Sequence, residues 1–292
     1  MRVDPLTSKK QIMNNTEFLR NEIFLRYGNI KRARGNFLYT EKGVRLTDLY
    51  REGGRAILGW GSEGSGAFTV FKDVLQRGLT GSFSTAMTYR LQKAISELLF
   101  SERKIFVFAS RQDALLGAQK FSTDISFYKP WALAKDSSAV DFSATDCVIV
   151  EAPFPWTGET ELLAVKEGLL ANGAPSGEGH SVEETAELNG LRTIYLAPAM
   201  EAALARSIYD LIAAIQSYSE KDFFIYDKYI APYWLRKGPY LFPKVAKEKY
   251  EDFVKFCLDC QLVPPPAYEQ NGIVPFKADK GVFARLSKSN FS

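Results

Sequence analysis

Residues 104–118 place an apolar segment, a serine and a helix start in the order that suits an anion site. Ile105–Ala109 are consecutively apolar, as expected for a strand buried on both faces of a parallel sheet. Ser110 can cap the helix that follows, with Asp113 in its first turn. A helix that begins after a strand presents free backbone N–H groups, which suit an anion such as phosphate. An ordinary strand–turn–helix connection without a ligand has the same pattern, so both interpretations stay open.

A glycine-rich segment, Arg51–Gly66, is the second stretch whose spacing suggests phosphate binding. Gly59, Gly61 and Gly64 match the pattern G-x-G-x-x-G. That pattern binds a dinucleotide only when a buried strand comes directly before it and a helix follows. The residues before Gly59 do not form a convincing buried strand, so we interpret the segment as a loop.

The remaining reactive side chains indicate packing more than catalysis. His180 is the single histidine and lies in a loop rich in glycine, which makes a zinc site improbable. No G-x-S-x-G sequence is present to recruit it into a serine triad. Cys257 and Cys260 are spaced C-x-x-C inside an amphipathic segment, where core packing is favoured over redox chemistry. Aromatic side chains more often pack in a core than contact a ligand, so we interpret Tyr128 and Trp131 as core residues.

Composition excludes several classes of protein. Apolar residues make up 46% and charged residues 24% of the 292 positions, which is typical of a globular chain. The 37 basic and 34 acidic residues are nearly balanced without a basic block, so we expect no nucleic-acid partner. No apolar run approaches the ~20 residues that span a bilayer, so no membrane partner is expected. Three cysteines, a polar N-terminus and no signal peptide favour the cytoplasm.

Hydrophobic periodicity predicts an alternation of helices and strands in the middle of the chain. It predicts helices at 89–100, 161–170, 200–215 and 250–258, buried strands at 105–109, 147–150 and 193–197, and short strands at 273–276 and 282–286. Glu41–Gly43 has the sequence of a hairpin turn. The pattern predicts a large α/β domain at 51–220 and a small α+β domain from 1–50 and 221–292.

Three stretches together resemble the class III aminotransferases, which are fold-type I pyridoxal-phosphate enzymes. They are the hairpin Arg34–Leu49, the turn Ser110–Ala114 in place of the family's Ser-Gly-Thr/Ser-Glu-Ala, and Val148–Pro153 in place of its Glu-Pro strand end. The resemblance implies a shortened fold-type I large domain, with a mostly parallel sheet covered by helices on both faces, and a homodimer. It also implies a cofactor site at Ser110, Arg111, Gln112, Asp113, Tyr128 and Glu151.

The chain departs from this family where the chemistry is most demanding. The family binds its cofactor as a Schiff base to a lysine that follows the Glu-Pro strand, and an aspartate holds the pyridine nitrogen. Between Asp136 and Glu220 the sequence contains one lysine, Lys166, which the pattern places on a helix beside Glu167 with its side chain in solvent. Asp210 is the one aspartate between Cys147 and Glu220 and falls inside a predicted helix.

The turn Ser110–Ala114 also differs from the family's phosphate-binding turn. Arg111 stands where the family has a glycine, and Gln112 where it has a hydroxyl residue. Arg111 can grip an anion or fill the space that the cofactor would occupy. We expect an aminotransferase-like protein with a binding or assembly role and with no catalytic residue, no metal and no covalent cofactor. Alternatives are a pyridoxal-phosphate aminotransferase with a displaced lysine, and an enzyme of another class that binds a phosphate-bearing ligand.

Overall fold

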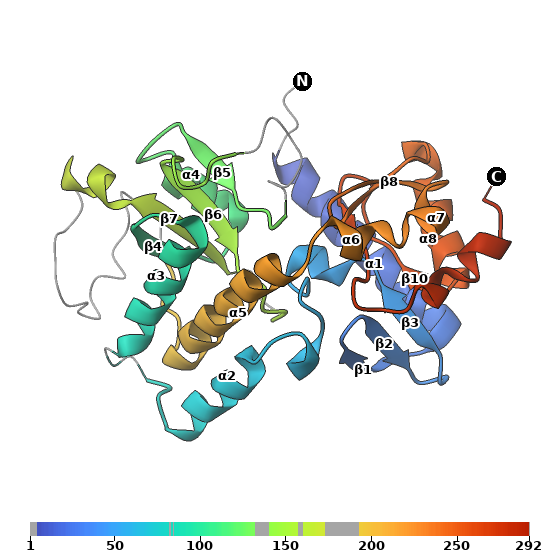
Figure 1. Ribbon diagram of the computed structural model, residues 1–292, viewed down its shortest axis with the longest axis horizontal. Helices are drawn as coiled ribbons and strands as arrows, with labels where there is room; N and C mark the ends of the chain where they lie inside the picture. The colour runs from blue at the N-terminus through green and yellow to red at the C-terminus, as the bar shows by residue number, and fades with distance from the viewer. Residues whose placement is uncertain are drawn as a thin grey trace. The chain divides into compact units, whose positions relative to one another are not determined.

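The computed structural model describes residues 5–81, 83, 85–131, 140–156, 160–172 and 193–291. The chain splits into two compact units, one formed by 1–64 and 218–292 and the other by 65–217. Figure 1 labels the main elements of both units. The domain boundaries that the sequence places after residues 50 and 220 stay a prediction.

The first unit contains two small sheets and the helices from both ends of the chain. Its four-stranded sheet has the order β1-β2-β3-β10, and its three-stranded sheet the order β11-β9-β8. The strands are β1 (Ile30–Arg34), β2 (Phe37–Thr40), β3 (Arg45–Asp48), β8 (Trp234–Lys237), β9 (Tyr240–Pro243), β10 (Leu262–Val263) and β11 (Gly272–Ile273). The helices are α1 (Pro5–Tyr27), α6 (Glu220–Phe224), α7 (Asp227–Ile230) and α8 (Tyr250–Asp259). The strand β10 joins β3 in parallel, so the two ends of the chain share one sheet.

The hairpin predicted at Glu41–Gly43 is confirmed. Gly43 has a φ of 77° between β2 and β3, a left-handed conformation that glycine adopts without a steric cost. Beyond β3, the fully buried Arg51 donates to the carbonyl oxygens of Asp48 (2.8 Å) and Ala56 (3.2 Å) and to the side chain of Asn36. These bonds compensate the cost of burying a guanidinium, whose burial lowers the pKa of Arg51 to about 10.

The C-x-x-C pair lies in the core of the first unit. Cys257 is fully buried on α8 and Cys260 follows the helix at 4% exposure. Burial raises the pKa of both thiols, so neither is poised to form a thiolate. Both cysteines are free, and the packing role favoured from the sequence agrees with this burial.

The described residues of the second unit form a four-stranded sheet and four α-helices. The strands are β4 (Arg103–Phe108), β5 (Ile125–Phe127), β6 (Cys147–Glu151) and β7 (Glu161–Lys166), in the order β4-β7-β6-β5. The helices are α2 (Ala67–Gln76), α3 (Ala86–Leu99), α4 (Arg111–Ala118) and α5 (Pro198–Ser217). The helices and strands predicted at 89–100, 105–109, 147–150 and 200–215 are thus confirmed, as is the helix predicted at 250–258 in the first unit.

The sheet of the second unit is mixed, which corrects the mostly parallel sheet implied by the family resemblance. The strand β5 is parallel to β6, but β7 is antiparallel to both β4 and β6. Residues 161–170, predicted to be a helix, form β7 followed by a 3-10 turn at Glu167–Asn172. The connection from β6 to β7 is too short for a crossover helix, so β7 must return antiparallel to β6.

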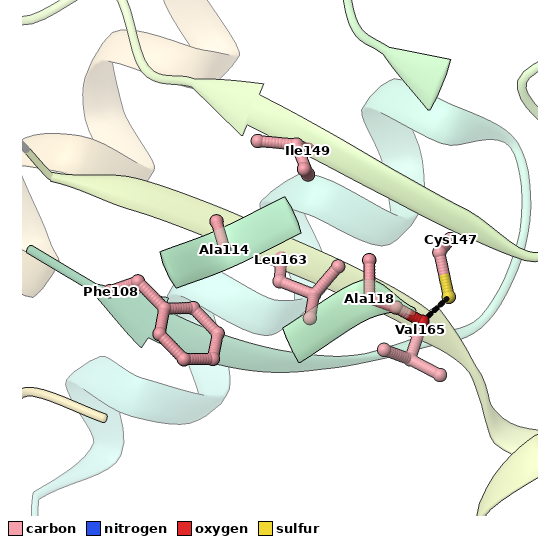
Figure 2. Packing of buried hydrophobic residues seen from close by; sticks show 7 residues of the cluster. All are labelled: Phe108, Ala114, Ala118, Cys147, Ile149, Leu163 and Val165. Carbon is pink, nitrogen blue, oxygen red and sulfur yellow. Dashed lines mark hydrogen bonds between the residues drawn. The ribbon is translucent and has the colours of Figure 1, made fainter. Parts of the chain in front are cut away.

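One face of this sheet packs against α4 (Figure 2). Phe108, Leu163, Val165, Cys147 and Ile149 from three strands meet two alanines of the helix, and all seven side chains are buried. Because strand residues alternate between faces, these positions identify which side chains point toward α4. Gly117 lies on the same helix, and a Cβ there would come within 2.6 Å of the Phe108 ring.

Two other predicted strands are wrong. Residues 193–197 are irregular, although the backbone N–H of Ile194 donates to Val107 of β4 at 2.8 Å. Residues 282–286 overlap two 3-10 turns, Lys280–Phe283 and Leu286–Lys288. Both segments have the apolar composition of strands, but their pairing depends on neighbours that local sequence does not specify.

Arg103 fixes the loop that precedes β6. Its side chain is fully buried and donates to the carbonyl oxygens of Phe142, Ser143, Thr145 and Asp146 at 2.7–3.3 Å. A buried carbonyl without a donor costs free energy, so a single guanidinium satisfies four backbone groups of this loop. None of the helices described here is both long and apolar enough to cross a membrane.

Glu201 is a buried carboxyl group between α3 and α5. Its side chain is 7% exposed and accepts a hydrogen bond from the Thr88 hydroxyl at 2.8 Å. Burial raises the pKa of Glu201 above the ordinary value of 4.5. The folded protein therefore binds a proton at this site more tightly than the unfolded chain, and ionisation above pH 4.5 reduces stability.

We predict that Glu201→Gln stabilises the protein near neutral pH by on the order of 1 kcal/mol. Glutamine keeps an acceptor for Thr88 and carries no charge. The advantage should be absent near pH 4 and grow as pH rises through the raised pKa. Urea unfolding of both proteins from pH 4 to 8 measures it, with the exposed Glu167→Gln as the control. A difference that does not change with pH would contradict this account.

Candidate functional site

The carboxyl ends of β4, β5 and β6 lie at one end of the sheet, together with the start of β7. The register pairs Phe108 with Glu161 and Glu161 with Glu151, and Phe127 lies beside Ile149. Ser110 follows β4 and Tyr128 follows β5, so the structure brings the predicted residues to the same end of the sheet. This end is the candidate site.

Ser110 and Asp113 close the start of α4. Ser110 is the N-cap residue, and its hydroxyl oxygen accepts the Asp113 N–H at 3.1 Å, which confirms the predicted cap. The same hydroxyl donates to the Asp113 carboxylate at 2.6 Å. The side chains that would meet a phosphate group at this helix start are therefore bonded to each other.

Arg111 lies over an aromatic ring. Its guanidinium carbon is 3.9 Å from the centroid of the Phe127 ring on β5, a cation–π contact. The neighbouring Gln112 is exposed on the first turn of α4. Of the two roles considered for Arg111, this contact favours filling space beside the sheet over gripping an anion.

Two glutamates face each other across the ends of β6 and β7. Glu151 is exposed and Glu161 is 7% exposed. Strand alternation places both on the α4 side, because Ile149 and Leu163, two residues earlier and later, pack against that helix. With Asp113 in α4, this end of the sheet carries three carboxylates on one side. Arg111 and Lys129 lie at the same end, so the site carries charges of both signs.

Tyr128 continues the strand pairing beyond β5. Its backbone N–H donates to Ile149 at 2.8 Å, and its ring packs on Phe142 with centroids 5.0 Å apart. Burial raises the pKa of the Tyr128 phenol, so it stays protonated at neutral pH. The aromatic packing favoured from the sequence agrees with these contacts.

Lys166 lies at the opposite end of the sheet. It is the last residue of β7 and pairs with Arg103 at the start of β4. Five residue steps of extended chain separate it from Glu161, which amounts to about 17 Å. Its ammonium donates to the Ala144 carbonyl and lies 4.0 Å from the Asp146 carboxylate. The prediction that Lys166 lies on a helix is wrong, and the residue instead holds the 141–146 loop.

Lys129 is a residue that sequence reasoning missed. It lies two positions after Phe127, level with Glu151 in the parallel register. The side chain is half-buried, and burial lowers the pKa of its ammonium. A lowered pKa is a property of nucleophilic lysines. The family resemblance directed attention to lysines after the Glu-Pro strand, and Lys129 precedes it in sequence.

The other residues singled out from the sequence lie elsewhere. Asp210 on α5 accepts hydrogen bonds from the Ser65 hydroxyl (2.6 Å) and the Gly66 N–H (2.9 Å), and pairs with Arg206 at 2.9 Å. It therefore fixes the start of α2 rather than a pyridine nitrogen. His180 falls outside the described residues, within which no group of three or more histidine, cysteine or acidic side chains is placed to hold a metal ion.

Sequence comparisons give relatives of unassigned function. No protein-family model matches the chain. An uncharacterized protein of Treponema pallidum (strain Nichols) is 28% identical over 294 residues, covering 87% of this chain and 91% of its own length. An uncharacterized protein of Borreliella burgdorferi is 28% identical over 102 residues, which cover 35% of this chain and 37% of that protein.

Structural comparisons show the fold. Ornithine delta-aminotransferase of Plasmodium falciparum superposes with a TM-score of 0.61 at 10% identity, covering 94% of this chain and 96% of that one. Acetylornithine aminotransferase of Elizabethkingia anophelis gives 0.60 at 11% identity, covering 92% and 97%. A beta-phenylalanine aminotransferase of Variovorax paradoxus gives 0.59 at 12% identity, covering 97% and 92%. The chain has the aminotransferase fold, as the resemblance predicted.

Lys166 and the α4 turn do not fit the Schiff-base cofactor of aminotransferases with this fold. The lysine that follows the Glu-Pro strand in sequence is at the far end of the sheet, where it contacts Ala144 and Asp146. At the near end, Ser110 is engaged by Asp113 and two glutamates lie on the same face. The required lysine and phosphate contacts are therefore not brought together by Lys166 and the α4 turn.

We predict that Ser110→Ala destabilises the protein by about 1 kcal/mol, because α4 loses its cap and the Asp113 carboxylate loses a donor. Gln112→Ala, an exposed change in the same helical turn, is the control and should leave the free energy of unfolding unchanged. Urea unfolding of the three proteins measures both effects. Equal stability of the wild type and Ser110→Ala would contradict a stabilising role for this cap.

Proposed function

We propose that this chain is a shortened, non-catalytic relative of the class III aminotransferases that acts as a cytoplasmic binding or assembly protein. The observation that carries the proposal is the position of Lys166, paired with Arg103 about 17 Å of extended strand away from the end that holds Ser110. A lysine at that distance cannot reach a cofactor whose phosphate lies at the start of α4. The aminotransferase fold itself is the frame on which the proposal rests.

The contacts of the other residues expected at a cofactor site also support the non-catalytic proposal. Asp210 holds the start of α2, Arg111 lies on Phe127, and Ser110 bonds Asp113. Ser110, Arg111, Asp113 and Asp210 each have a partner within the protein. A fold does not imply an activity, so a chain with the aminotransferase fold can have a binding role instead.

We also propose that the protein assembles as a homodimer. Exposed apolar side chains favour association, and the first unit exposes Phe224 (63%), Ile225 (48%) and Leu235 (51%). Tyr226 and Tyr240, in the same part of the chain, are buried at 0% and 7% exposure and belong to the core.

Lys129 favours a second candidate function, an aminotransferase with a displaced lysine. It lies at the end of the sheet where a cofactor would be, and its ammonium has a lowered pKa. A third candidate, an enzyme of another class with a phosphate-bearing ligand, would use the start of α4. The three candidates differ in whether a lysine reacts and whether a phosphate ligand binds.

We predict that protein incubated with pyridoxal phosphate, reduced with borohydride and digested shows no single lysine modified in stoichiometric yield. Mass spectrometry of the peptides measures the labelling, and transamination assays with a panel of amino acids run in parallel. Lys166→Arg is a matched control. Because we expect Lys166 to be labelled no more than any surface lysine, its removal should leave the total labelling unchanged.

Near-complete labelling of Lys129, lost in Lys129→Arg and accompanied by transamination above background, would overturn the non-catalytic proposal and establish the second candidate. Thermal shifts with nucleotides and sugar phosphates address the third. Stabilisation by one such ligand, abolished by Ser110→Ala and absent with inorganic sulfate, would establish an enzyme or carrier of another class.

A further inference from the structure

One face of α3 carries large side chains that the described part of the second unit leaves open. Tyr89 is 69% and Phe100 is 87% exposed, at the two ends of the helix. Between them lie Lys93 and Glu97, both exposed. The spacing places these four residues along one face. They border a hollow of about 400 Å³ on the surface.

Phe100 occupies a conformation that its residue type does not favour. It is the C-cap of α3 with a φ of 53°, in the left-handed region where glycine is preferred. The N–H of the next residue, Ser101, donates to the Ser96 carbonyl at 3.1 Å and closes the helix end. A large aromatic side chain is thus held in solvent at a position where glycine would cost less free energy.

The order of the side chains along this face is self-complementary. In two antiparallel helices related by a twofold axis, each residue faces one on the opposite side of the centre. The midpoint between Lys93 and Glu97 in the sequence is position 95. The midpoint between Tyr89 and Phe100 is half a residue away from it. A single axis therefore places Lys93 against Glu97 twice and Tyr89 against Phe100 twice.

The residue near the twofold axis and the charge of Glu97 both suit two α3 helices that pack against each other. Ser96, a small residue, lies next to the axis and is 9% exposed. The hydroxyl of Tyr209 on α5 donates to the Glu97 carboxylate at 3.3 Å, which holds that charge beside α3. Opposite charges that meet across an interface fix its register and suppress other pairings.

We propose that the α3 face formed by Tyr89, Lys93, Ser96, Glu97 and Phe100 is the surface on which a second copy of this chain docks, antiparallel and about a twofold axis near residue 95. This assignment rests on the proposed homodimer and is independent of whether the protein is catalytic.

The neighbouring exposed residues enlarge this surface. Phe83, 70% exposed, precedes α3, and Tyr195, 45% exposed, points its hydroxyl toward the carbonyl oxygens of Gly81 (3.4 Å) and Phe83 (3.5 Å). Both lie at the N-terminal end of α3, the end that meets Phe100 of the second copy. Stable interfaces bury about 1,200–2,000 Å² in total, so the contact requires this extension.

A charge-reversal cycle tests the proposal on the full chain. Sedimentation equilibrium over a hundredfold range of concentration gives the dimer dissociation constant. Lys93→Glu and Glu97→Lys should each weaken the dimer about tenfold, because each turns two attractive pairs into repulsive ones. The double variant Lys93→Glu/Glu97→Lys restores both pairs with reversed signs and should return the constant to the wild-type value.

Phe100→Gly separates docking from folding. Glycine relieves the left-handed strain, so the melting temperature of the variant should rise while its dimer weakens. Leu25→Ser, which removes an exposed apolar side chain of α1 in the first unit, is the control and should leave the dissociation constant unchanged. A monomeric wild type would overturn the proposal. A dimer unaffected by the single variants, or one not restored in the double variant, would overturn it as well.

Discussion

The antiparallel course of β7 between β4 and β6 is the constraint on which the second unit depends. It pairs Arg103 with Lys166 at one end and Phe108 with Glu161 at the other. This register sends the lysine in the expected window of sequence to the amino end of the neighbouring strands. It also brings a second glutamate, Glu161, beside Glu151 at the end of the sheet where Ser110 lies. The direction of β7 therefore determines that Lys166 lies at one end of the sheet and Glu161 at the other.

Buried polar groups explain why the reactive residues have structural partners. Arg103 satisfies four carbonyl groups of the loop before β6, and Lys166 satisfies another, at Ala144. Asp210 binds the start of α2 through the Gly66 N–H. Leaving such backbone groups without partners would cost more than the net gain from most surface contacts. Arg103, Lys166 and Asp210 thus each bind backbone groups of their own unit.

Much of the fold follows from local sequence. Helices with a regular apolar stripe, such as α3 and α5, and the cap at Ser110 are specified by residues close in the chain. The segment Glu161–Lys166 is different, because four consecutive apolar residues suit a helix or a doubly covered strand equally. Its pairing with β4 and β6 decides the outcome. The burial of Lys129 likewise depends on tertiary neighbours, which the sequence pattern does not contain.

The distance between the start of α4 and the end of β7 tests the central claim most directly. Spin labels at the exposed positions Gln112 and Glu167, introduced as Gln112→Cys and Glu167→Cys in a chain with its three buried cysteines replaced, report this distance by pulsed electron resonance. The account predicts a separation on the order of 20 Å, since about five strand residues lie between the two ends. Strong dipolar broadening of the continuous-wave spectrum, which requires labels much closer than this, would place Lys166 at the candidate site and contradict the account.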